Sequence, residues 1–288
     1  MAFYYIDNEF GLRARLLAEA SRKAGVEFVQ VRPDEFDNTQ IPNLTRSDFL
    51  YRGVAKHDCP TAVIVERLLL NDSVTTFYNS PEIGRGTRLG SFVIHSSAGI
   101  PIPKTVWSLT RDTSVLKRYV DYLGGFPVVI KVLNSSRGAG VMRADSWQSL
   151  VSLNDYLLRS DQVFVLREFI DVGVPAHSCR AVVLGGQVTV AYRMQQPEGD
   201  DFRSNAGKRL RQRTLLTLIE QEQATMILSV ESLGLELGAV DFAYTAEGRL
   251  VVFEVNFPFA FGSVLTKLQY DLPGAMVAYL QKKSSWQA

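Results

Sequence analysis

The first hundred residues alternate between apolar strands and helices with apolar positions at helical spacing. The stretch FYYI at residues 3–6 predicts a strand, followed by a capped helix that ends at a glycine before a second strand. Leu12, Leu16, Ala20 and Ala24 form the apolar stripe of that helix. A further helix is expected in PEIGRGTRLGSFVIHSSAG, before the proline-rich IPIPKT. These patterns indicate an N-terminal α/β domain that ends near residue 97.

Strands cluster towards the end of the chain. A helix leads to the apolar strand FPVVIKVL, the small-residue turn NSSRGAGV and the helix SWQSLVSLNDYLLR. The segments QVFVLREFI, CRAVVLGG, QVTVAYRM and RLVVFEVNF then have strand character and glycine-bearing turns. One long helix interrupts them, and its expected apolar positions are Leu216, Ile219, Met226, Ile227, Val230 and Leu233.

The last of these strands places oxygen ligands on one face of a hairpin. If the hairpin is symmetric about Glu247 and Gly248, Asp241 lies opposite Glu254, and Asn256 follows on the same face. Two carboxylates and a carboxamide are hard oxygen donors that suit Mg²⁺. The alternative is a solvated sheet face, which is the commoner environment of a single strand carboxylate.

Composition narrows the classes of partner. The chain of 288 residues has 31 Lys and Arg against 30 Asp and Glu, a balance that argues against a nucleic-acid protein with a broad basic surface. Two cysteines, Cys59 and Cys179, give no disulfide framework or zinc spacing. No signal peptide and no membrane span are apparent, so we expect a soluble cytoplasmic protein.

A phosphate-binding turn is the second candidate site. Lys131 ends an apolar strand, and Gly138 and Gly140 follow in a turn whose backbone N–H groups could surround a phosphate. No Gly-Lys-Ser/Thr follows, so this is not a Walker A sequence. A surface lysine beside an ordinary turn is the alternative.

Two further segments could complete such a site. Glu168, Phe169 and Ile170 follow a strand and could offer an apolar slot to a planar base, although Glu168 could equally be a salt-bridged edge residue. The polar run DDFRSN could gather negative charge or form a solvated loop. His57 with Cys59, and His177 with Cys179, raise thiol chemistry, but no oxyanion hole or orienting acid accompanies either pair.

The order of these segments resembles a known family. From residue 97 to about 275, the chain is similar to the ATP-grasp superfamily, and within it to the RimK-like carboxylate-amine ligases. The resemblance is carried by IPIPKT, PVVIKVLNSSRGAGV, VLREFI, CRAVVLGGQVTVAYR, GDDFRSN, LGLELGAVDFAY and VVFEVN. It implies an α/β (α+β) fold of three subdomains around one cleft: an N-terminal pre-ATP-grasp domain (1–97), a central lid (98–166) and a mostly antiparallel C-terminal subdomain with the metal site (167–288).

The resemblance also implies a role for each matching residue. ATP would be bound through its phosphates by Lys104, Lys131 and the loop Ser135, Ser136, Arg137, Gly138, Ala139 and Gly140. Glu168, Phe169 and Ile170 would hold adenine, largely through the backbone. Asp241, Glu254 and Asn256 would bind two Mg²⁺, or Mn²⁺. The residues that would act on the phosphate, the acyl-phosphate or the substrate are Arg180, Arg193, Arg203 and Asn205.

Two positions depart from the family pattern. Ser178 stands where an aspartate often binds ribose, and AGKRLRQ replaces the Gly-Gly segment expected after FRSN. The implied reaction joins a small-molecule or peptide carboxylate to an amine through an acyl-phosphate, releasing ADP and phosphate, and the family favours self-association. A non-catalytic ATP-binding module and a phosphotransferase are the alternatives.

Overall fold

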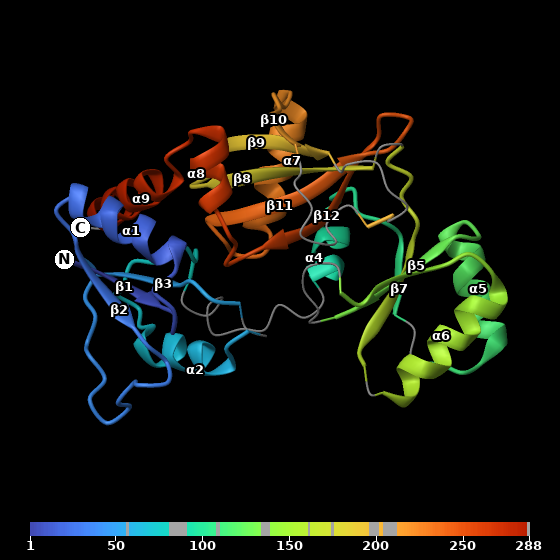
Figure 1. Ribbon diagram of the computed structural model, residues 1–288, viewed down its shortest axis with the longest axis horizontal. Helices are drawn as coiled ribbons and strands as arrows, with labels where there is room; N and C mark the ends of the chain where they lie inside the picture. Colours follow the sequence, from blue (N-terminus) through green and yellow to red (C-terminus); the bar gives the residue numbers. More distant parts are fainter. Residues whose placement is uncertain are drawn as a thin grey trace.

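Three separate β-sheets organise the chain in the computed structural model (Figure 1). The structure describes residues 1–55, 58–80, 91–107, 110–133, 139–160, 162–173, 176–195, 202–203 and 212–286. Within these ranges, no helix is long and apolar enough to cross a membrane. The predicted mixture of α/β and antiparallel parts is confirmed.

The N-terminal sheet is parallel, with strand order β2-β1-β3. Its elements are β1 (Ala2–Ile6), α1 (Leu12–Lys23), β2 (Glu27–Val31), β3 (Phe49–Arg52) and α2 (Pro60–Leu69). The helices α1 and α2 lie on opposite sides of this sheet (Figure 1). Alternation along β1 explains this arrangement, since Tyr5 packs in the cluster that contains α1 residues and Ile6 in the one that contains α2 residues.

The helix α1 differs from the predicted stripe. It begins after Gly11 without a side-chain cap, and its buried residues include Ala14 and Leu17. Leu12 is 48% exposed. The buried face is therefore rotated relative to the predicted one, because the helix packs against both the sheet and the C-terminal helix rather than on one surface.

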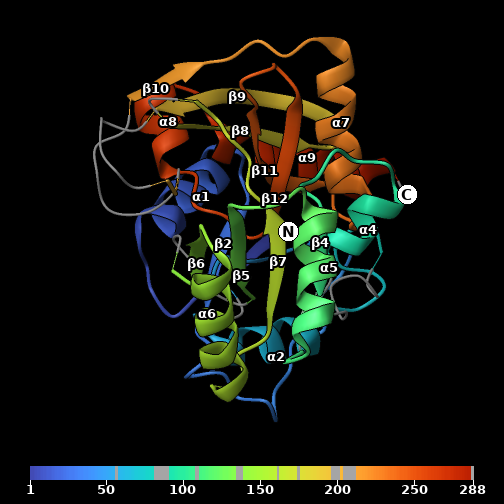
Figure 2. The same cartoon turned by 90° about the vertical axis from the view of Figure 1, so that its right-hand side faces the viewer.

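The second sheet and two helices span residues 105–168, which overlap the lid predicted at 98–166. From here on, the lid means residues 105–168. Its antiparallel sheet has the order β4-β7-β5-β6, and α5 and α6 cover one face of it (Figure 2). Asp112 caps α5 by accepting a hydrogen bond from the Ser114 N–H (2.8 Å). The elements are β4 (Thr105–Trp107), α5 (Thr113–Leu123), β5 (Val128–Val132), β6 (Val141–Ala144), α6 (Trp147–Arg159) and β7 (Phe164–Glu168).

The third sheet is antiparallel and has the order β10-β9-β8-β11-β12. Its elements and the neighbouring helices are α4 (Ser91–Ser97), β8 (His177–Leu184), β9 (Gln187–Gln195), β10 (Gln212–Leu215), α7 (Glu220–Glu231), β11 (Leu237–Tyr244), β12 (Leu250–Asn256), α8 (Gly262–Leu268) and α9 (Leu272–Trp286). Gly185 and Gly186, both at positive φ, make the two-residue turn between β8 and β9.

The long helix predicted in this region starts later than expected. Leu216 and Ile219 precede α7, and the N–H of Leu216 donates to the carbonyl of Ala191. Ile219 is 65% exposed. Their apolar spacing arises from an edge strand and its connection, which a helical pattern cannot distinguish over so short a stretch.

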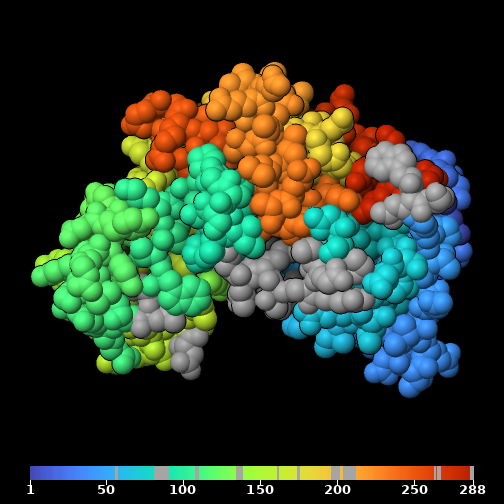
Figure 3. Space-filling view, turned by 180° about the vertical axis from the view of Figure 1, so that it is seen from behind, coloured from blue at the N-terminus to red at the C-terminus, as the bar shows by residue number. Residues whose placement is uncertain are grey.

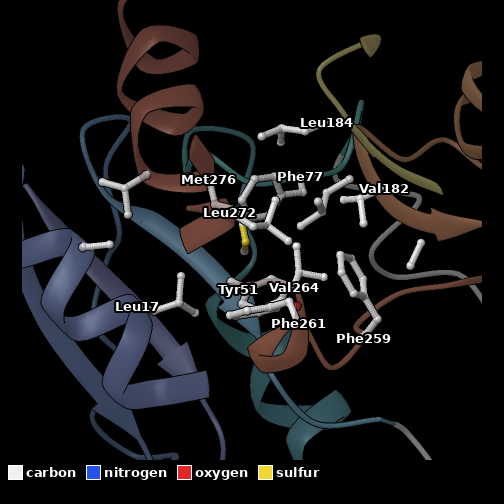
Figure 4. Packing of buried hydrophobic residues seen from close by; sticks show 14 of the residues in the cluster. Leu17, Tyr51, Phe77, Val182, Leu184, Phe259, Phe261, Val264, Leu272 and Met276 are labelled. Carbon is white, nitrogen blue, oxygen red and sulfur yellow. The ribbon is translucent and has the colours of Figure 1, made fainter. Parts of the chain in front are cut away.

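The apolar clusters show which of the three sheets pack together. One cluster combines α1 and β1 with β8, β9 and α9, and Figure 4 shows Leu17, Tyr51, Phe77, Val182 and Met276 meeting in it. A second cluster likewise contains residues of the first and third sheets. The third cluster, which includes Ile130 and Leu166, lies wholly within the lid. In Figure 3 the lid accordingly forms a green lobe at one side of the molecule, with the orange α7 near the middle.

Candidate functional site

The strands β11 and β12 bring the predicted oxygen ligands together. Asp241 pairs with Glu254, and Asn256 pairs with Ala239, so all three side chains start from one face of the sheet, called here the metal face. The amide of Asn256 donates from Nδ2 to Asp241 Oδ2 (3.0 Å) and to Glu254 Oε1 (3.4 Å). The three groups therefore lie close enough to share one cation.

The register of this hairpin contains an irregularity. At its tip Tyr244 pairs with Leu250, and a shift between Asp241 and Phe242 leaves Phe253 as an extra residue on β12. Without this β-bulge Asp241 would face Phe253, and Glu254 would point to the opposite face. The bulge thus aligns the two carboxylates.

Each carboxylate has a cation beside it. Arg180 on β8 binds Asp241 through two bonds, Nε to Oδ1 (2.6 Å) and Nη2 to Oδ2 (2.8 Å). Lys131 reaches from the lid to Glu254, with Nζ 2.5 Å from Oε2. The positive charge of Lys131 lowers the pKa of Glu254 to about 2. Although burial acts in the opposite direction, Asp241 raises the pKa of Arg180. The charge of Lys131 therefore favours the ionised form of Glu254, which is the form in which a carboxylate binds a metal.

The donor set fits Mg²⁺. Two carboxylates and one amide are oxygen ligands of the type that Mg²⁺ takes, together with water and phosphate oxygens. Asn256 would have to turn its amide, because its Nδ2 now faces both carboxylates. Among the described residues no group of three His, Cys, Asp or Glu forms another candidate metal site.

The lid contributes a second cation that sequence reasoning missed. Arg167 on β7 donates from Nη1 to the carbonyl oxygen of Phe253 (3.3 Å), while its buried Nε has no hydrogen-bond partner in the part of the chain that the structure describes. Burial lowers the pKa of Arg167, and the charge of Glu254 opposes that shift. An arginine inside the apolar strand FVLRE was the available signal.

The predicted base-binding residues lie at the end of β7. Glu168 forms an ion pair with Arg249 (3.2 Å), and its N–H donates to the carbonyl of Lys104 (3.0 Å). The ring of Phe169 lies 6.4 Å from that of Phe202, and the guanidinium of Arg143 lies 4.6 Å from the Phe169 ring centre. Phe202 of the polar run DDFRSN thus lies near the predicted adenine slot. Ile170, the next residue after Phe169, is half-buried.

Two predicted phosphate ligands point elsewhere. Lys104 is exposed, and its Nζ donates to the carbonyl of Tyr122 on α5 (3.3 Å). Arg193 pairs with Cys179, whereas Arg180 pairs with Tyr192, so the two arginines start from opposite faces of the sheet. The structure does not bring Lys104 or Arg193 to the metal face.

The remaining predicted residues have varied positions. Ser178 is buried on the same face as Arg180, and its Oγ has no hydrogen-bond partner among the described residues. Gly140 adopts φ +72°, and its carbonyl accepts from the N–H of Val132 (2.8 Å). Ala139 precedes Gly140 in the chain, and Arg203 is half-buried. Outside the described residues are Ser135, Ser136, Arg137, Gly138 and Asn205.

Among the described residues, neither thiol has a neighbour that would make it a nucleophile, and His57, the predicted partner of Cys59, lies outside the described residues. Burial raises the pKa of Cys179, which disfavours the thiolate, and Arg193 only partly offsets this. The sulfur of Cys59 lies 3.2 Å from Thr61 Oγ1. Neither arrangement activates a cysteine.

Comparison with known proteins places this geometry in a family. The family model of the RimK-like ATP-grasp domain matches residues 88–280, which is more than half of the chain. The chain therefore belongs to the RimK-like ATP-grasp family. As a member of that family it is an ATP-dependent ligase, which confirms the class expected from the resemblance.

Individual relatives support the same assignment. The chain is 28% identical over 223 residues to a probable alpha-L-glutamate ligase of Syntrophotalea carbinolica, covering 77% of this chain and 71% of the relative. A probable alpha-L-glutamate ligase of Legionella pneumophila is 30% identical over 65% of this chain, and the match spans 60% of its length.

A solved structure shares the fold. The ATP-grasp ligase PsnB, complexed with a phosphomimetic variant of its minimal precursor, Mg and ADP, is 15% identical. It matches with a TM-score of 0.73 over 98% of both chains.

Proposed function

We propose that the protein joins a carboxylate to an amine through an acyl-phosphate, using ATP and Mg²⁺. The observation that carries this proposal is the convergence of Asp241, Glu254 and Asn256 on one face, with Lys131 reaching Glu254 from the lid. A family of ATP-dependent ligases and a structural neighbour complexed with Mg and ADP support the choice of cofactors.

The residues suit phosphoryl transfer followed by acyl transfer. A carboxylate oxygen of the substrate attacks the γ-phosphorus, the bond to the bridging oxygen breaks, and ADP leaves. The amine then attacks the acyl carbon, phosphate leaves, and the amine loses a proton. Bound Mg²⁺ would neutralise phosphate charge, with Asp241, Glu254 and Asn256 as its ligands. Lys131 would exchange its contact with Glu254 for a phosphate oxygen, and Arg180 would hold the carboxylate of Asp241 in place through its two hydrogen bonds.

The names of relatives guide the choice of substrates. Curated relatives are named alpha-L-glutamate ligases, and the neighbour PsnB is complexed with a precursor variant. We therefore propose glutamate, other amino acids and acidic peptides as the first candidates. Self-association is also a proposal, and sedimentation of the purified chain would test it.

The test measures ADP release and amide formation together. The chain is incubated with ATP, Mg²⁺ and a panel of carboxylates, with and without amines, and hydroxylamine is added to trap an acyl-phosphate as a hydroxamate. We expect an amide by mass spectrometry and a hydroxamate when the amine is omitted. ADP with a stable phosphorylated product and no amide would favour a phosphotransferase. Nucleotide binding without any turnover would favour a non-catalytic module.

A further inference from the structure

The nucleotide needs more positive charge on the lid than Lys131 alone supplies. A triphosphate is multiply charged, and charge-assisted hydrogen bonds from lysine and arginine are its usual protein contacts. Lys104, the other lysine assigned by resemblance, precedes Thr105, which pairs with Arg167. Alternation therefore directs Lys104 towards the opposite face, where its Nζ meets Tyr122 of α5. A different side chain must provide the second cation on the inner face of the lid.

Arg167 occupies that face. It pairs with Val129, and Lys131 pairs with Val165, so both cations start from the face of the lid sheet that is not covered by the buried lid core. Both reach β12, at Phe253 and Glu254 respectively. The two cations are separated by two residues along the strands, or about 7 Å.

The position of Arg167 lies between the two ends of the expected nucleotide. Lys131 marks the end where the metal face and the terminal phosphates meet. Glu168 and Phe169, next to Arg167 in the chain, begin the predicted base-binding segment. A cation between them lies where the phosphate nearest the ribose would pass.

The contacts of Arg167 leave donor capacity for a ligand. A guanidinium has five N–H donors, and among the described residues Arg167 makes one hydrogen bond, of 3.3 Å, while its buried Nε has no partner there. Such a buried unpaired donor is costly unless a ligand satisfies it. Arg143, on the same face, differs because it is paired with Asp145 (2.6 Å) and packs over Phe169.

We propose that Arg167 binds the α-phosphate of the nucleotide and thereby serves as the second phosphate-binding cation of the lid. This inference rests on the proposed ATP site. It assigns to an arginine of β7 the contact that the resemblance assigned to Lys104.

Binding of adenosine, AMP and ADP separates the α-phosphate from the rest of the ligand. The affinities of wild type, Arg167→Met and Arg167→Lys are measured by calorimetry or by competition with a fluorescent nucleotide. We expect Arg167→Met to lose roughly tenfold in affinity for AMP and ADP, as for one charge-assisted hydrogen bond. Adenosine affinity should stay unchanged, which also shows that the variant is folded. Arg167→Lys should recover part of the loss.

Two further variants sharpen the comparison. Lys117→Met removes an exposed lysine of α5 that lies over Trp147, so it controls for net charge and should leave all three affinities unchanged. Lys104→Met should cost less AMP affinity than Arg167→Met.

Several outcomes would overturn the proposal. A larger loss in Lys104→Met than in Arg167→Met would return the α-phosphate to Lys104. An equal loss of adenosine and AMP affinity in Arg167→Met would show a role in the base slot or in lid structure. Wild-type binding of ADP with an unaffected Arg167→Met variant would reject Arg167 alone, whereas no ADP binding by wild type would reject the proposed function itself.

Discussion

The Nζ of Lys131 lies 2.5 Å from Oε2 of Glu254, and this ion pair joins the lid to the metal face. Both groups are expected to bind other partners once a nucleotide and Mg²⁺ are present: the ammonium a phosphate, and the carboxylate a metal. The pair therefore has to separate when the ligands bind. A stronger ion pair would therefore lower the affinity for both the nucleotide and Mg²⁺.

Replacing Glu254, one of the two carboxylates of the metal face, should raise the nucleotide affinity without metal and lower it with metal. In Glu254→Gln, Lys131 loses its ion-pair partner and a negative charge near the phosphates disappears. We expect ATP to bind several-fold more tightly than to wild type in excess chelator. In saturating Mg²⁺ the variant should bind more weakly, because one metal ligand is lost. Calorimetric titrations under the two conditions measure this, and weaker binding in both would contradict it.

The same variant should be inactive although folded. Loss of one charged metal ligand should lower kcat by at least about a hundredfold, a magnitude typical of removing one electrostatic stabiliser of a transition state. Steady-state ADP release measures the rate, and circular dichroism checks the fold. Normal ADP release by Glu254→Gln would count heavily against the metal site.

Acid should weaken the lid contact through Glu254. Its pKa of about 2 in the folded protein lies below the ordinary 4.5, so its contribution to stability is complete above pH 4.5 and is lost as the pH falls towards 2. Because the side chain is 39% exposed, water screens the pair and we expect only about 1 kcal/mol. Urea unfolding of metal-free wild type and Lys131→Met across this range measures it. A difference between the two proteins that did not vary with pH would contradict the prediction.

Breaking the buried ion pair between Arg180 and Asp241 on the metal face should lower the stability far more. Asp241 is only 2% exposed, and among the described residues Arg180→Met would leave its carboxylate with one hydrogen-bond donor, the amide of Asn256. We expect a loss of about 3–5 kcal/mol in the free energy of unfolding. The double variant Arg180→Met/Asp241→Asn removes both charges and should recover much of this loss. Chemical denaturation tests both, and a double variant less stable than the single one would refute the electrostatic explanation.

The sequence predicted that Asp241, Glu254 and Asn256 share one face, and the structure confirms this shared face but reaches it through a β-bulge. Alternation placed Glu254 with Asn256, and equal spacing from the turn placed Asp241 opposite Glu254. The turn itself is centred differently, and the extra residue Phe253 restores the alignment. Bulges depend on packing against neighbouring strands, so the pattern of residues did not indicate one.

A second bulge explains why the two arginines separate. Val183 pairs with Val188, but Val182 pairs with Val190, which leaves Thr189 extra on β9. Without that shift, Arg193 would lie on the face of Ser178 and Arg180; with it, Arg193 lies on the other. A one-residue slip cannot be read from an apolar strand.

Long-range docking was likewise beyond the sequence. The order of segments indicated the three-part fold, and alternation along a strand puts Arg167 and Leu166 on opposite faces. Which face of the lid meets β12 is decided by tertiary packing, so the sequence alone does not single out Arg167, which contacts Phe253. The contact of Lys104 with the carbonyl of Tyr122 depends on the same packing.

Because the lid has its own apolar cluster, we expect this part of the chain to be exchangeable. The parts of the chain before and after the lid share the two other apolar clusters. The helix α9 also contacts the end of α1, where Gln281 Nε2 donates to the carbonyl of Ala24 (3.2 Å). A lid grafted from another family member would replace its own packing without opening the remaining core. In such chimeras the exchanged lid would alter the nucleotide preference. The rest of the protein would keep its preference for the acceptor substrate.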